Sequence, residues 1–146
     1  MLSSTKLFFA GLALCFASTS FAVVPADMSS CEPSSNLKVA YKTVDKTIAI
    51  DIEGKDQDGK PFKGTTTYNI VGAVDFTAAD FNADDTKVIN TVANITSFTG
   101  GSILAVSTGT EKPTQLMFFE FAPGQYSVIW VVQGYPLPLG KTDQCN

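Results

Sequence analysis

Residues 115–133, QLMFFEFAPGQYSVIWVVQ, form the most apolar run that follows the N-terminal segment. The run predicts two strands, residues 116–121 and 126–132, because Pro123-Gly124 between them favours a turn. With those two residues as the loop, side-chain alternation places six residues on one face of a hairpin: Met117, Phe119, Phe121, Tyr126, Val128 and Trp130. A type II turn twists in the wrong sense for a tight hairpin, so a bulge could shift this pairing by one residue.

The composition fits one packed domain with few charges. The chain has 146 residues, of which 45% are hydrophobic and 16% charged, and this balance argues against disorder. All ten basic residues are lysines, no histidine occurs, and the net charge is −4 without any basic run. Nucleic acid is therefore not an expected partner, since binding to phosphates needs clustered positive charge.

Residues 1–22 have the features of a signal peptide. Lys6 precedes an apolar run over residues 7–17, and Ser20 and Ala22 provide small side chains for cleavage after Ala22. The apolar run is too short to cross a bilayer, which needs about 20 residues, so no stable membrane insertion is expected. We therefore expect an exported protein, either periplasmic or secreted.

Export leaves two cysteines in the processed chain. Cys31 and Cys145 are expected to form an intramolecular disulfide, because exported proteins with two thiols usually pair them. Intermolecular pairing or free thiols are the alternatives. On the chain-entropy model, closing so long a loop stabilises the fold by roughly 4–5 kcal/mol.

The rest of the chain is mostly strand-like. Residues 23–36 predict an irregular leader, and residues 37–44, 47–53, 65–74 and 102–107 predict strands. Residues 134–140 contain Pro136 and Pro138, so they are expected to run as an extended tail. About seven strands result, which predicts an all-β domain over residues 37–146, either a single antiparallel β-sandwich or an up-and-down barrel.

Residues 86–98 fit two structures. Val88, Val92 and Ile95 lie at helical spacing, whereas the many β-branched residues of this segment favour a strand. We predict a strand, with an α+β fold containing a helix at residues 86–98 as the alternative. Just before it, Thr77 and Asp80 have the spacing of a capping box, which predicts one helical turn near residues 78–81.

The missing residue types limit the chemistry. Without histidine, neither Ser-His-Asp nor Cys-His catalysis is available, and no phosphate-binding loop occurs. No catalytic residue, metal site or cofactor is assigned. Asp80, Asn82 and Asp84 have the spacing of a calcium loop, but Asp85 and Thr91 occupy positions where that loop needs Gly and Glu, so a solvated loop is favoured.

These observations favour a small exported binding or interaction module without catalytic chemistry. Its partner would be a protein or a small apolar ligand, held by the aromatic face of the hairpin through Met117, Phe119, Phe121, Tyr126 and Trp130. A barrel that carries an apolar ligand inside is the first alternative. A hydrolase using Glu120 or Asp80 as its acid is the second. Asn94, Ile95 and Thr96 form a sequence with the pattern of a glycosylation acceptor.

Overall fold

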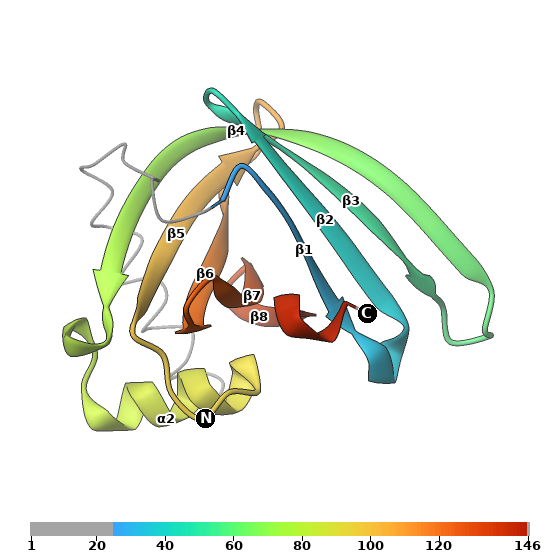
Figure 1. The fold of residues 1–146 in the computed structure, drawn as a ribbon. Helices are drawn as coiled ribbons and strands as arrows, with labels where there is room; N and C mark the ends of the chain where they lie inside the picture. Colours follow the sequence, from blue (N-terminus) through green and yellow to red (C-terminus); the bar gives the residue numbers. More distant parts are fainter. Residues whose placement is uncertain (1–24, 146) are drawn as a thin grey trace.

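A computed structural model describes residues 25–145 as an antiparallel barrel of eight strands closed in sequence order (Figure 1). The strands are β1 (Asp27–Glu32), β2 (Leu37–Val44), β3 (Thr47–Lys55), β4 (Pro61–Thr77), β5 (Gly100–Ser107), β6 (Thr114–Ala122), β7 (Gln125–Val132) and β8 (Tyr135–Lys141). Helix α2 (Ala83–Ala93) and the short 3-10 turn Ala78–Asp80 connect β4 to β5, and two further 3-10 turns are Pro33–Ser35 and Thr142–Gln144. The all-β prediction is confirmed in its barrel form.

The predicted strand at residues 86–98 was wrong, and the helical alternative is correct for most of that segment. The Asn82 side chain caps the helix by accepting a hydrogen bond from the backbone N–H of Asp85 at 2.8 Å. Ile89 and Ala93 are its buried residues, so the apolar positions at helical spacing decided the structure over β-propensity. The predicted turn before it is present as Ala78–Asp80, with the Asp80 carboxylate accepting from the backbone N–H of Thr77 at 2.7 Å.

Two segments expected to be irregular are strands. Part of the predicted leader forms β1, which pairs with β2 along its whole length. The predicted tail forms β8 in spite of Pro136 and Pro138. β8 is paired over most of its length with β7 alone and meets β1 only at Lys141 opposite Cys31, so the missing proline donors cost less than they would in a central strand.

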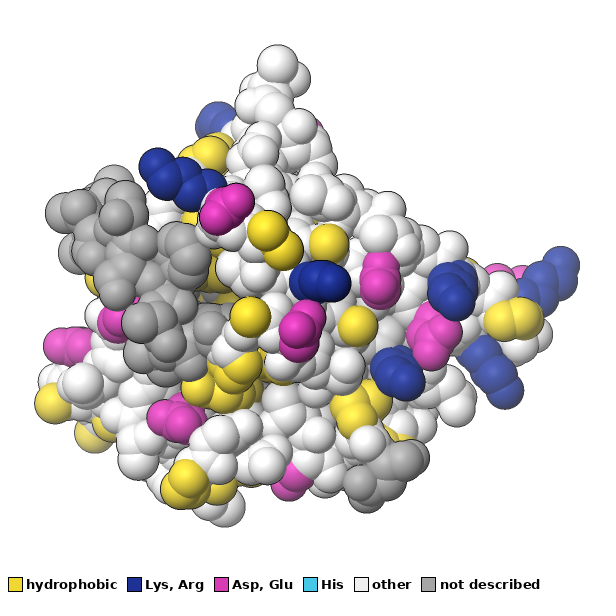
Figure 2. All heavy atoms as spheres, turned by 45° about the horizontal axis from the view of Figure 1, so that its top comes forward, with side chains coloured by type: hydrophobic (Ala, Val, Ile, Leu, Met, Phe, Trp, Pro, Cys, Tyr) yellow, Lys and Arg dark blue, Asp and Glu magenta, His cyan; other side chains and the backbone are white. Residues whose placement is uncertain are grey.

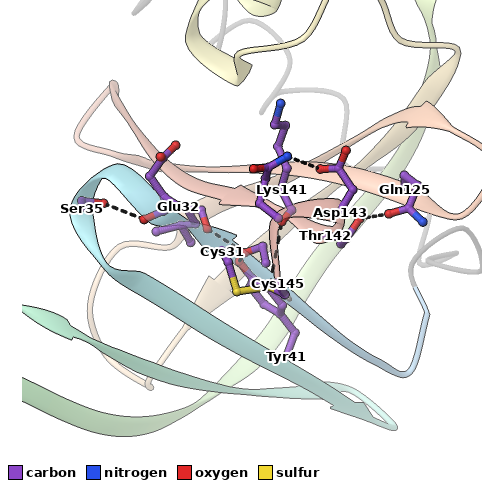
Figure 3. The surroundings of a disulfide bond; sticks show 12 residues. Cys31, Glu32, Ser35, Tyr41, Gln125, Lys141, Thr142, Asp143 and Cys145 are labelled. Atoms are coloured by element: carbon purple, nitrogen blue, oxygen red, sulfur yellow. Dashed lines mark hydrogen bonds between the residues drawn. A yellow bond between two sulfur atoms is a disulfide. The ribbon is translucent and has the colours of Figure 1, made fainter.

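The barrel closes through a short seam between β8 and β1. Beside the Cys31–Lys141 pair, the buried Ser30 hydroxyl donates to the backbone carbonyl of Leu139 at 2.7 Å and lies 2.6 Å from the Tyr41 hydroxyl. The predicted disulfide is confirmed: Cys31 and Cys145 are bonded across a sequence separation of 114 residues (Figure 3). Few interactions therefore hold the two ends of the sheet together, and the disulfide is one of them.

The interior of the barrel is filled by apolar side chains. Tyr41 and Phe118 meet there edge to face, with ring centroids 5.7 Å apart. Around them packs one buried cluster: Val39, Ile48, Ile50, Ile70, Ala73, Leu104, Val106, Leu116, Tyr126, Val128 and Leu139. The interior is thus a packed core of the kind that eight-stranded barrels can fill with side chains.

The predicted pairing within the β6–β7 hairpin is shifted by one residue. Phe119 lies opposite Ser127 and Glu120 opposite Tyr126, and the register slips between Glu120 and Ala122. The bulge at Phe121 is the feature that the type II turn made plausible. As a result Met117 and Phe119 lie on the outer face of the sheet, whereas Tyr126 and Trp130 lie on the inner face with Phe118.

A second apolar cluster lies between α2 and the outer face of β5–β7. It consists of Phe76, Phe81, Ile89, Ala93, Phe98, Ile103, Met117, Phe119, Ile129 and Val131. The Ser127 hydroxyl ties the helix to the sheet by donating to the Ala93 carbonyl at 2.6 Å. This explains why both faces of the hairpin are apolar: one faces the barrel interior and the other faces the helix.

Strand β4 bends near its middle and belongs to both halves of the barrel. Its first part pairs with β3 and its second part with β5, and the register shifts between Ile70 and Gly72, which leaves Val71 as the extra residue of a bulge. Figure 1 shows the bend as an arch at the top of the barrel, with the β3–β4 turn projecting at the right.

We expect the stability of the fold to decrease above pH 10. Burial raises the pKa of the Tyr41 phenol well above its usual range, an effect only partly offset by its hydrogen bond to Ser30. Above pH ~10 the unfolded chain loses this proton and the folded chain keeps it, so the free energy of unfolding falls by up to about 1.4 kcal/mol per pH unit. Below pH ~10 the protonated Tyr41 side chain contributes its full share to the stability of the fold. Urea unfolding between about pH 8 and pH 11 measures this effect. The free energy of unfolding should fall less steeply with pH in Tyr41→Phe than in the wild type, and equal slopes would contradict this account.

Candidate functional site

A cleft of about 530 Å³ opens at the C-terminal end of α2, and we call it the amide cleft. It is lined by Asn90, Thr91, Asn94, Ile95, Thr96, Phe121 and Lys141. These residues come from the last turn of α2, the loop after it, the β6 bulge and the end of β8. The cleft therefore lies outside the barrel interior, where three separate segments meet.

The helical wall of the cleft is built by the way α2 ends. Asn94 adopts a left-handed conformation with φ of 57°, which stops the helix and turns the chain towards Thr96. The Asn90 side-chain amide donates to the carbonyl of Thr96 at 3.2 Å and holds the loop against the helix. The Thr91 hydroxyl donates to the Lys87 carbonyl at 2.9 Å, so its oxygen remains able to accept.

The opposite wall consists of an aromatic ring and an ammonium group. The bulge at the end of β6 places the half-buried Phe121 at the cleft. Lys141 points away from the Cys31–Cys145 disulfide (Figure 3), and its Nζ donates to the carbonyl of Asn94 at 3.1 Å. The same Nζ lies 5.7 Å from the centroid of the Phe121 ring, within the range of a cation–π contact. Lys141 thus joins the two walls.

The amide cleft has hydrogen-bonding capacity that its own residues do not use. Asn90 Oδ1 is buried and has no hydrogen-bond partner among residues 25–145. An unsatisfied buried polar atom costs free energy, and such atoms are few in folded proteins. Asn94 is exposed, and Lys141 keeps donors beyond the one given to the Asn94 carbonyl. The cleft can therefore offer both donors and acceptors beside an aromatic ring.

The structure separates the five residues that the sequence places on one binding face. Phe121 alone lines the amide cleft. Met117 and Phe119 have no exposed surface and belong to the cluster beneath α2, whereas Tyr126 is buried in the barrel interior. Trp130 is half-buried on the inner face, its ring 5.4 Å from that of Tyr68 and its Nε1 donating to Thr114 Oγ1 at 2.7 Å. Their predicted role in binding rested on a shared face that does not exist.

Sequence analysis missed the residues that make up most of the cleft. Asn94 could have been predicted as a helix end, because asparagine is among the residues that end a helix in a left-handed conformation. That prediction requires residues 86–98 to be interpreted as a helix. No feature of the sequence around Lys141 indicates a role in this cleft. Its side chain reaches Asn94 through the fold, across a separation of 47 residues.

The carboxylates considered from the sequence have local structural partners. Glu120 accepts a hydrogen bond from the backbone N–H of Gly124 at 3.0 Å and so fastens the β6–β7 turn. Asp80 caps the 3-10 turn Ala78–Asp80 and Asn82 caps α2, each by accepting a backbone N–H through one side-chain oxygen. Over residues 25–145, no group of three or more His, Cys, Asp or Glu side chains is arranged to hold a metal ion.

No protein-family model, curated protein or solved structure matches this chain. Within the described part of the chain, no helix has the length and apolar character needed to cross a membrane.

Proposed function

We propose that this protein is an exported, non-catalytic binding module that holds a saccharide in the amide cleft. The observation that carries the proposal is the composition of the cleft walls: amide and hydroxyl groups on one side, with the Phe121 ring and the Lys141 ammonium group on the other. Ligand sites typically combine an apolar surface with a few polar groups that fix orientation.

The chemistry of a sugar matches both walls. Each sugar hydroxyl both donates and accepts a hydrogen bond, and the asparagine and threonine side chains provide both kinds of partner. The C–H face of a sugar ring can pack on Phe121, which supplies a flat apolar surface. The charge of Lys141 favours a saccharide that carries a carboxylate, because an ion-assisted hydrogen bond is stronger than a neutral one.

Export is the second part of the proposal. A disulfide in the fold is compatible with an oxidising compartment, since such bonds are rare where thiols are kept reduced. Residues 1–22, proposed as a signal peptide cleaved after Ala22, lie outside the described residues. Cleavage there would leave Cys31 near the start of the processed chain, free to pair with Cys145 after export.

A site on the surface is favoured over a ligand carried inside the barrel. An internal carrier needs space between the strands, whereas Tyr41, Phe118, Leu104 and Leu116 fill the centre and are at most 2% exposed. The cleft, by contrast, is open to solvent and offers both polar groups and an aromatic ring. We therefore keep the carrier as the weaker proposal.

Binding to the amide cleft should be visible in the amide NMR spectrum of the oxidised protein. With glucuronate and glucose as probes, we expect shifts concentrated at residues 90–96, 121 and 141, with tighter binding of glucuronate. Phe121→Ala should weaken binding of both probes by about fivefold, since a ring contact contributes on the order of 1 kcal/mol. Lys141→Met should remove the preference for glucuronate.

The matched control is Lys55→Met, which makes the same change on an exposed lysine at the end of β3, outside the cleft. It should bind both probes as the wild type does. Shifts that cluster instead around Tyr68 and Trp130, or binding that survives both cleft substitutions, would contradict the proposal.

A further inference from the structure

Strand β4 has a long free edge. It pairs with β3 from Pro61 to Asn69, but its pairing with β5 begins only at Asn69. Along residues 61–68 the edge facing away from β3 has no strand partner in the described part of the chain. Figure 1 shows this part of β4 as the outer strand of the projecting β3–β4 arm.

The backbone groups that point out from this edge follow from the pairing with β3. The N–H of Ile70 donates to the carbonyl of Lys46 at 2.7 Å, and the N–H of Asp56 donates to the carbonyl of Lys60 at 2.9 Å. Hydrogen-bonded residues alternate in an antiparallel pair, so the even-numbered residues of β4 bond to β3. The N–H and C=O groups of Lys63, Thr65 and Thr67 therefore point away from β3, towards the free edge.

The edge is also exposed on both faces and regular. Every residue from Pro61 to Thr67 is exposed, including Phe62 at 45%. No register shift interrupts the pairing of β3 with β4. Free edges of this length are templates for another strand, and proteins usually shorten, bend or cover them.

We propose that a second copy of this chain pairs with this edge, antiparallel, about a two-fold axis at Thr65. The pairing satisfies the outward backbone groups of Lys63, Thr65 and Thr67 in both copies, with about six hydrogen bonds, two for each of three residue pairs. It sets Phe62 opposite Tyr68 of the second copy, which joins two aromatic side chains on one face. A continuous sheet then runs through both barrels.

Self-complementarity of the side chains favours this register over the two whose axis lies on a neighbouring outward-pointing residue. With the axis at Thr65, Lys63 lies opposite Thr67 of the second copy, whereas an axis at Lys63 would set the two lysines against each other. An axis at Thr67 would extend the new strand past Asn69, where β5 already occupies the edge. Figure 2 shows lysine and acidic side chains together on the projecting end of the molecule, so the arm carries no uniform charge that would repel its copy.

Sedimentation equilibrium of the full processed protein tests this proposal. We expect a concentration-dependent dimer that Thr65→Pro abolishes, because proline removes the N–H that pairs at the axis. Thr65→Val keeps the N–H and the β-branched shape, so it should dimerise as the wild type does. The melting temperature of each variant shows whether the barrel itself is intact.

Two charge variants keep the test independent of any strain from proline. In Thr67→Glu a carboxylate lies opposite Lys63 of the second copy, and the two-fold axis repeats this pair once. The dissociation constant of the dimer should therefore fall several-fold, whereas Thr67→Lys should raise it by a similar factor. A monomer at every concentration would overturn the proposal, and so would a dimer that is unaffected by both Thr65→Pro and Thr67→Lys. In the monomeric case the edge would be left for an extended segment of another protein.

Discussion

Removing the Cys31–Cys145 disulfide should lower the free energy of unfolding by about 4 kcal/mol. The bond joins residues separated by 114 positions, and a cross-link across so long a loop restricts the unfolded chain strongly. It also lies at the seam where β1 and β8 share a single residue pair. Urea unfolding of the double variant Cys31→Ala/Cys145→Ala, compared with the oxidised wild type, measures the difference.

The location of the effect can be checked as well as its size. Amide hydrogen exchange in the double variant should accelerate first in β1 and β8, because these strands lose the link that closes the barrel. A stability loss below about 1 kcal/mol, or faster exchange confined to strands away from the seam, would show that the remaining seam contacts close the barrel without the disulfide.

Gly140→Ala should destabilise the fold by about 3 kcal/mol or more. A Cβ atom at this position would lie 2.3 Å from the backbone carbon and oxygen of Cys31, and the φ of 91° already disfavours any side chain. Both neighbouring atoms belong to the backbone, so no rotamer change can relieve the overlap and the seam must open. Thermal or urea unfolding of the oxidised variant measures the loss.

Gly59→Ala is the control for backbone conformation alone. Its φ of 79° is similarly unfavourable, but no atom lies within 4 Å of the added Cβ. The control should lose only about 1 kcal/mol, the usual cost of a left-handed conformation for alanine. Equal losses for the two variants would mean that the close approach of β8 to β1 is not what requires glycine at position 140.

Local patterns predicted most of the barrel correctly. Alternation in residues 37–44 and 47–53 reflects strands with one buried face, and both strands are confirmed as β2 and β3. The pairing of Cys31 with Cys145 was predicted from the expected export and from the number of thiols, and it is confirmed. β1 and β8 were missed because prolines and small polar residues argue against strands, although the edges of a seam tolerate them.

The division of the predicted binding face between two sides of the sheet has one physical origin. A one-residue bulge at Phe121 moves every earlier residue of β6 to the opposite face, so the predicted binding face was divided between two cores. The helix that covers the outer face was predicted as a strand. Without that helix, the apolar side chains on the outer face of the hairpin had no packing partner in the predicted fold. The amide cleft then depends on contacts between Asn94, Phe121 and Lys141 that no local pattern contains.

Screening the oxidised, processed protein against an array of saccharides tests the central claim most directly. We expect binding to a limited set, enriched in sugars that carry a carboxylate, with the signal lost in Phe121→Ala and reduced in Lys141→Met. Lys55→Met should leave the pattern unchanged. Absence of binding to any saccharide, or a pattern that both cleft variants retain, would contradict the account of the amide cleft as the binding site.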